Sequence, residues 1–182
     1  MNEFMSAAKN TAERLLAQQL PRRWRHVQSV AAKATRVAEA LPMSERPILV
    51  AAAWLHDIGY SPGLKDSEMH ALDGARWLRA NGYDPRVTSL VAHHSCALYE
   101  AEERGLAVTL RSEFPPEETP TSDALWYSDM TTGPDGQDLT VDERLTEVRQ
   151  RYGPDHIVTR FWARAEPALL AAVARVEAGQ PM

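Results

Sequence analysis

The stretch Ile48–Tyr60, ILVAAAWLHDIGY, decides the fold and poses a chemical problem. Eight apolar residues run from Ile48 to Leu55, as expected for a buried helix, and they lead directly into His56 and Asp57. An unpaired carboxylate is costly to bury, so Asp57 must be paired, hydrogen-bonded or bound to a metal. We therefore expect its partners among the other polar residues that interrupt apolar patterns.

Length and composition are typical of one soluble domain. The chain has 182 residues, of which 44% are hydrophobic and 25% charged, and these values predict a single domain over residues 1–182. The net charge of −5 does not indicate an extended nucleic-acid surface. The longest apolar run has eight residues, far short of the ~20 that span a bilayer. The only cysteine is Cys96, and the N-terminus lacks a secretory pattern, so we predict a cytoplasmic protein.

Helical periodicity dominates the chain. Apolar residues at spacings of three and four mark one helix face at Val27, Val30, Ala31, Ala34, Val37, Ala38 and Leu41. The pattern as a whole predicts helices at about 3–19, 22–41, 45–58, 67–81, 85–104, 120–131, 140–152 and 155–178. The fold class is therefore predicted to be all-α, a single-domain helical bundle.

The segments between these helices carry turn and cap signals. Four residues are predicted helix N-caps: Ser44, Asp84, Thr119 and Thr140. Gly59 is predicted to end the helix of the opening stretch. Residues 106–110 (LAVTL) are the best strand candidate, residues 111–123 are predicted to form a surface loop, and residues 132–138 a turn.

Several residues could share a centre with His56 and Asp57. His26 borders the apolar face that begins at Val27, and His70 lies at the edge of another such face. Of the adjacent pair His93 and His94, the spacing favours His94 as the residue that points inward. Asp129 is a second acid within an apolar helix.

Ligand-type residues on five predicted helices favour a metal site inside the bundle. Imidazole nitrogen together with carboxylate oxygen suits Fe, Mn, Zn, Co or Ni better than Ca. Side chains from separate helices of a bundle can converge on one or two such divalent ions. His156 and Cys96 have no comparable setting and are interpreted as structural residues.

The chain resembles the HD-domain metal-dependent phosphohydrolases. Their signature, His … His-Asp … Asp, is matched by His26, His56, Asp57 and Asp129. The resemblance spans residues 20–135, and the helices predicted within 140–178 are expected to pack on that region as part of the same HD domain. It implies an HD-type bundle and a hydrolase that cleaves a phosphate ester or anhydride with a metal-activated water.

Two further histidines resemble the two-metal branch of that family. His70 and His94 fall where small bacterial HD proteins that hydrolyse dinucleoside polyphosphates carry extra histidines. By this resemblance, His26, His56, Asp57 and Asp129 hold one metal, and His70 and His94 hold a second. Asp57 bridges the two ions and can accept a proton from the water, so it is the predicted catalytic residue.

The expected partner is a small phosphorylated substrate such as a nucleotide. Many relatives have a lysine where this chain has Tyr60, so Lys65 is predicted to contact phosphate instead, together with Arg25. A solvated, charged helix end is the alternative interpretation of Arg25. For the whole protein, two alternatives remain open: an HD-type di-iron oxygenase and a non-catalytic module that senses a nucleotide.

Overall fold

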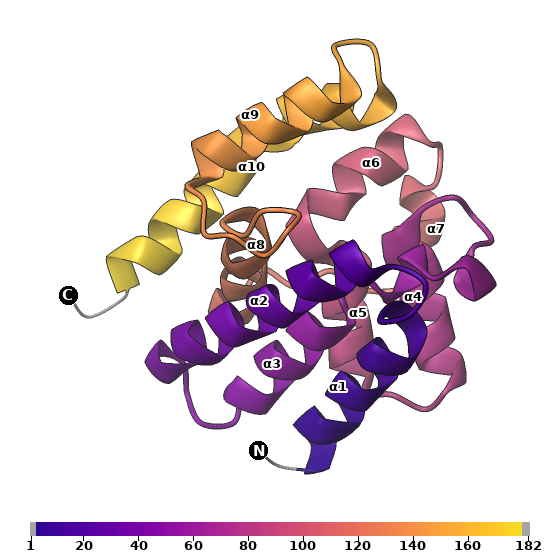
Figure 1. Cartoon of the computed structure of the whole chain (residues 1–182), viewed down its shortest axis with the longest axis vertical. Coiled ribbons are helices and arrows are strands. Elements are labelled where there is room, and N and C mark those ends of the chain that lie inside the picture. The colour runs from indigo at the N-terminus through magenta and orange to yellow at the C-terminus, as the bar shows by residue number, and fades with distance from the viewer. Residues whose placement is uncertain (1–2, 180–182) are drawn as a thin grey trace.

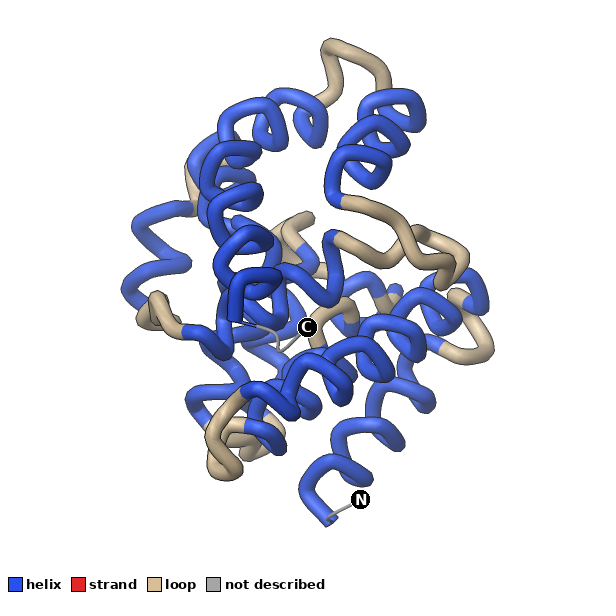
Figure 2. The backbone as a smooth tube through the Cα atoms, turned by 90° about the vertical axis from the view of Figure 1, so that its left-hand side faces the viewer, coloured by secondary structure: helices blue, strands red, loops and turns tan. Residues whose placement is uncertain are grey.

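The computed structural model describes residues 3–179 and is helical throughout, with loops between the helices (Figures 1 and 2). The α-helices are α1 (Glu3–Leu16), α2 (Pro21–Val37), α3 (Arg46–Leu55), α4 (His70–Ala80), α5 (Pro85–His93), α6 (Ala97–Glu103), α7 (Ala107–Glu113), α8 (Pro120–Met130), α9 (Val141–Tyr152) and α10 (Ile157–Gly179). Short 3₁₀ turns lie at Ala38–Ala40, Ile58–Tyr60, Pro62–Leu64 and His94–Cys96. The all-α, single-domain prediction is confirmed.

Helix α3 is central, as its uninterrupted apolar sequence requires. It packs against α1, α2, α5 and α8, and the residues from Leu49 to Ala53 are all buried. The predicted apolar face of α2 is also buried, with Val27, Val30 and Ala34 fully inaccessible to solvent. The body formed by α1–α8 therefore has one continuous core, and His56 follows directly after its central helix.

The last two helices form a second, smaller core against that body. Helices α9 and α10 pack on each other, and α10 also contacts α6 and α8 (Figure 1). Phe161, Trp162 and Leu169 of α10 bury their side chains with Leu145 and Val148 of α9. This pair covers one side of the region where the predicted metal ligands meet.

Several helix boundaries differ from the predictions. The predicted helix at 85–104 is broken, because Ser95 and Cys96 adopt left-handed backbone conformations with φ of 47° and 60°. The strand predicted at 106–110 is wrong, because these residues begin α7, which packs through Leu110. Helix α7 continues to Glu113 and so extends into the segment predicted as a loop. Short sequences with β-branched residues follow their tertiary contacts rather than intrinsic propensity.

The predicted caps are mostly correct. The Asp84, Thr119 and Thr140 side chains accept backbone N–H groups at the starts of α5, α8 and α9. Ser44 is not a cap, since α3 begins after Glu45 without a side-chain cap. Gly59 does not end α3 either, because that helix stops at Leu55 and Gly59 lies in the following 3₁₀ turn.

The turn predicted at 132–138 is present. An antiparallel bridge between Thr132 and Asp138 closes it. Within residues 3–179, no helix is both long enough and apolar enough to cross a bilayer.

Candidate metal centre

Six side chains from five segments of the chain converge inside the body. Two groups each place three potential ligand atoms within 4.8 Å of one another: His26, His56 and Asp129 in one, and Asp57, His70 and His94 in the other. These are the six residues that the sequence singled out as metal ligands. Five of them are buried and His70 is partly exposed, so the centre lies at the end of a cavity.

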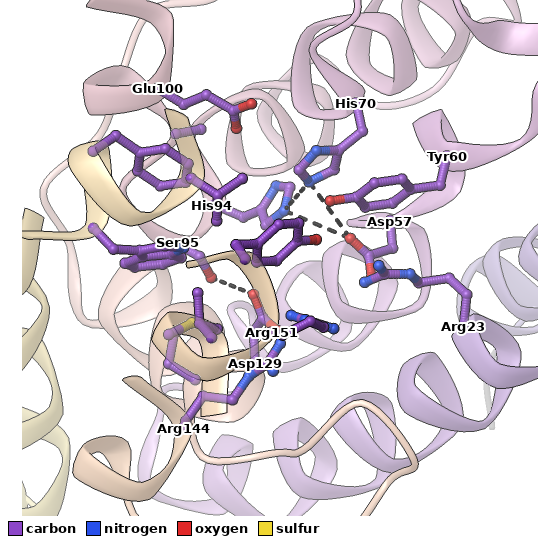
Figure 3. A pocket seen from close by; sticks show the side chains of 17 residues that line it. Arg23, Asp57, Tyr60, His70, His94, Ser95, Glu100, Asp129, Arg144 and Arg151 are labelled. Atoms are coloured by element: carbon purple, nitrogen blue, oxygen red, sulfur yellow. Dashed lines mark hydrogen bonds and ion pairs between the residues drawn. The ribbon is translucent and has the colours of Figure 1, made fainter. Parts of the chain in front are cut away.

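The carboxylate of Asp57 lies between the two groups, and Figure 3 shows it facing His70 and His94. Its Oδ2 atom is 3.3 Å from His56 Nε2 and 3.8 Å from His26 Nε2. Its Oδ1 atom is 3.6 Å from His70 Nε2 and 3.9 Å from His94 Nε2. One oxygen thus faces each group, which is the arrangement expected of a bridging carboxylate ligand.

Backbone carbonyl groups orient three of the histidines. The Nδ1 atoms of His26, His56 and His94 donate to the carbonyls of Gly133, Ala53 and Val91 at 2.9, 2.8 and 2.6 Å. Such bonds fix the tautomer that leaves Nε2 free to bind a metal.

Three of the four Nε2 atoms have settings that suit a metal ligand. His56 Nε2 is buried and has no hydrogen-bond partner among the described residues. The Nε2 atoms of His70 and His94 face each other at 3.2 Å. The donor set, with its unpaired buried nitrogen, therefore fits one or two divalent metal ions.

Asp129 is held by hydrogen bonds from neighbouring segments. Its Oδ1 atom lies 3.0 Å from His26 Nε2, and its Oδ2 atom accepts a hydrogen bond from the Ser95 hydroxyl. The left-handed turn at Ser95 brings this hydroxyl to Asp129. The break between α5 and α6 therefore helps to orient the Asp129 carboxylate. Lys33, which is buried, anchors the end of α8 by donating to the Thr131 carbonyl and hydroxyl.

Buried charges set the protonation of the centre. Burial opposes ionisation of Asp57, but Arg23 and His56 outweigh it and hold the pKa of this carboxyl well below its usual range. Burial and the neighbouring His94 lower the pKa of His70, and burial also lowers the pKa of His94. Ionised carboxylate and neutral imidazole are the forms that bind metal.

His56 is the exception among these imidazoles. Burial acts to lower its pKa, but the neighbouring carboxylates of Asp57 and Asp129 raise the pKa to about 9. His56 is therefore protonated near neutral pH while no cation is bound.

Metal affinity is expected to depend on pH for this reason. Binding must displace the His56 proton, so the apparent affinity for Mn²⁺ should rise about tenfold per pH unit from pH 6.5 to 8.5 and level off near 9. Calorimetric titrations of the metal-free protein at several pH values measure this slope. An affinity that does not change between pH 6.5 and 8.5 contradicts the expected proton release.

An arginine that the sequence analysis did not select lies against the centre. Arg23 Nη1 donates to Asp57 Oδ2 at 2.7 Å, and its guanidinium lies 4.0 Å from the Tyr60 ring centroid. Tyr60 in turn stacks on His70 with ring centroids 4.0 Å apart. This stack orders both the arginine and the histidine. Arg23 lies three residues before His26, a spacing that places both on one helix face and could have identified it.

The two predicted phosphate contacts differ in their position relative to the centre. Arg25 is exposed and pairs with Asp135 at 3.2 Å, as does its neighbour Arg22 at 2.8 Å, so both dock the 132–138 turn onto α2. Arg25 does not line the cavity at the centre. Lys65 lines an adjoining groove with Tyr60 and His70. His93 lies apart from the centre, and its Nε2 atom donates a hydrogen bond to the Phe114 carbonyl.

The cavity has further lining residues that sequence reasoning missed. Ser95 lies in the break after α5, Glu100 belongs to α6, and Arg144 and Arg151 belong to α9 (Figure 3). No local pattern marks these residues, because they reach the centre only through the packing of α6 and α9. Cys96 is buried, and burial raises the pKa of its thiol to about 12, which agrees with its structural interpretation.

The fold and the site define an all-α protein with a buried His/Asp centre suited to divalent metal. A family model for the HD domain matches residues 23–131, more than half of the chain. The chain belongs to the HD domain family, which is part of the superfamily of metal-dependent phosphohydrolases. Comparisons with curated proteins and with solved structures gave no match. The family match includes all six converging side chains and ends before α9.

Proposed function

We propose that this protein is a two-metal phosphohydrolase that cleaves a phosphate ester or anhydride of a small metabolite, such as a nucleotide. One observation carries the proposal: the two oxygens of Asp57 face two separate groups of ligand atoms. His26, His56 and Asp129 would hold one cation, and His70 and His94 the other, with Asp57 shared between them.

When bound, the cations would supply Lewis-acid charge for the phosphate and would lower the pKa of a bound water. The chain itself contributes orientation and charge. Asp57 is ionised, because Arg23 and His56 hold the pKa of its carboxyl well below its usual range, and its carboxylate can accept a hydrogen bond from that water. Arg23, beside Asp57, is placed to contact an anionic substrate.

A metal assay followed by a substrate panel tests this function. Protein purified without added metal is analysed for metal content, loaded anaerobically with Mn²⁺, and assayed for phosphate release from nucleotides, sugar phosphates and dinucleoside polyphosphates. We expect release without O₂ and its loss on chelation. Iron-dependent O₂ consumption without phosphate release would instead identify an oxygenase. Phosphate release that survives complete metal removal contradicts the proposal.

A further inference from the structure

Helix α9 lies outside the matched HD region yet forms one wall of the cavity at the centre. Arg144, Val148 and Arg151 line the cavity at spacings of four and three, so they share one face of the helix. Figure 3 shows Arg144 and Arg151 on the side of the cavity where Asp129 lies, whereas Glu100 lies on the opposite side. Two guanidinium groups are thus placed beside the candidate metal ligands.

These two arginines share one anionic partner. Both pair with a single carboxylate, Glu147: Arg144 directly, and Arg151 through Nε at 3.4 Å. The Arg144 side chain is only 8% exposed, and its Nε atom has no hydrogen-bond partner in the part of the chain that the structure describes. A buried N–H without an acceptor carries a free-energy penalty that a bound anion can remove.

A third arginine of α9 provides the contrast. Arg149 is 42% exposed and pairs with Glu166 of α10, away from the cavity. It has the ordinary setting of a surface ion pair. The buried, unpaired N–H of Arg144 on the cavity face of α9 therefore has no counterpart at Arg149.

The shape of the cavity limits what the arginines could bind. Its volume is about 80 Å³, below the roughly 300–1,000 Å³ typical of sites that enclose whole ligands. An open groove of about 570 Å³ adjoins it and shares Tyr60, His70 and Tyr152 as lining residues. A phosphate group fits the enclosed part only if the remainder of the molecule extends into the groove.

We propose that Arg144 and Arg151 form, with Arg23, a subsite for the dianionic terminal phosphate of the substrate. This inference rests on the proposed function. It narrows the class of substrates to phosphomonoesters and molecules with a terminal phosphoryl group. A phosphate with large substituents on both sides has no room in the enclosed cavity. Guanidinium groups suit the oxygens of a terminal phosphate, because each can donate two parallel hydrogen bonds.

Binding of inorganic phosphate to the Mn²⁺-loaded protein tests the subsite directly. Arg151→Gln and Arg144→Lys should each raise the Kd for phosphate about tenfold, with unchanged metal content. The matched control Arg149→Gln should bind phosphate like the wild type. Because Arg144 is buried, circular dichroism of each variant verifies folding, and Arg151→Gln tests the subsite even if the Arg144 variant does not fold.

The outcomes separate this inference from the proposed function. Unchanged phosphate affinity in Arg151→Gln, or equal weakening in Arg149→Gln, overturns the subsite. If the arginine variants bind phosphate more weakly but the wild type hydrolyses no phosphate ester, the subsite is supported and the proposed hydrolase function is rejected. Turnover of p-nitrophenyl phosphate should exceed that of bis(p-nitrophenyl) phosphate, and a preference for the diester overturns the restriction to terminal phosphates.

Discussion

Asp57→Asn is expected to remove metal from both halves of the centre and to lower phosphohydrolase activity by about 10³-fold or more. The wild-type carboxylate presents one oxygen to His26 and His56 and the other to His70 and His94. Asparagine preserves the shape of the side chain but has no negative charge and only one oxygen. Each group of ligands therefore loses charge, and the shared contact disappears.

Metal content per chain and phosphate release measure this outcome together. Asp155→Asn is the matched control, since Asp155 is exposed in the loop between α9 and α10 and lies outside the centre. His94→Gln gives a second comparison, because it should weaken only the half that contains Asp57 and His70. Retention of two metal ions by a folded Asp57→Asn protein contradicts the bridging role.

Most of the helices and the six candidate ligands could be predicted because each depends on a local pattern. The apolar face of α2 repeats at helical spacing and is buried as expected. His26 and Asp129 were recognisable because a polar residue on such a face must have a partner. The Asp84 cap is equally local, since its side chain accepts N–H groups only two and three residues away.

Features that depend on distant segments could not be predicted in this way. The apolar spacing typical of a helix continues through Ser95, but the chain turns there. The Ser95 hydroxyl then donates a hydrogen bond to Asp129 of α8. The phosphate contact predicted for Arg25 fails for this reason, since no local pattern shows that its guanidinium pairs with Asp135, more than a hundred residues away in the sequence. Arg144 reaches the cavity only because α9 and α10 fold back over the body.

Gly59→Ala is the second substitution with a large expected effect. The 3₁₀ turn after Asp57 packs directly on α4, and a Cβ atom at Gly59 would lie 1.9 Å from the His70 carbonyl oxygen and 2.8 Å from the Gly74 nitrogen. These are backbone atoms, so α4 must move as a unit to relieve the overlap. His70 begins that helix and would move away from Asp57 and His94.

We expect this variant to lose about 1–3 kcal/mol of unfolding free energy and about 10²-fold in activity. Metal binding by the group with Asp57, His70 and His94 should weaken more than binding by the other group. The overlap falls on α4, which carries His70, and not on α2 or α8, which carry His26 and Asp129. Gly63→Ala is the matched control, since a Cβ atom there meets nothing within 4 Å. Denaturant unfolding and metal titration of both variants measure the difference. Wild-type stability and metal affinity in Gly59→Ala would show that contact between this turn and α4 does not position His70.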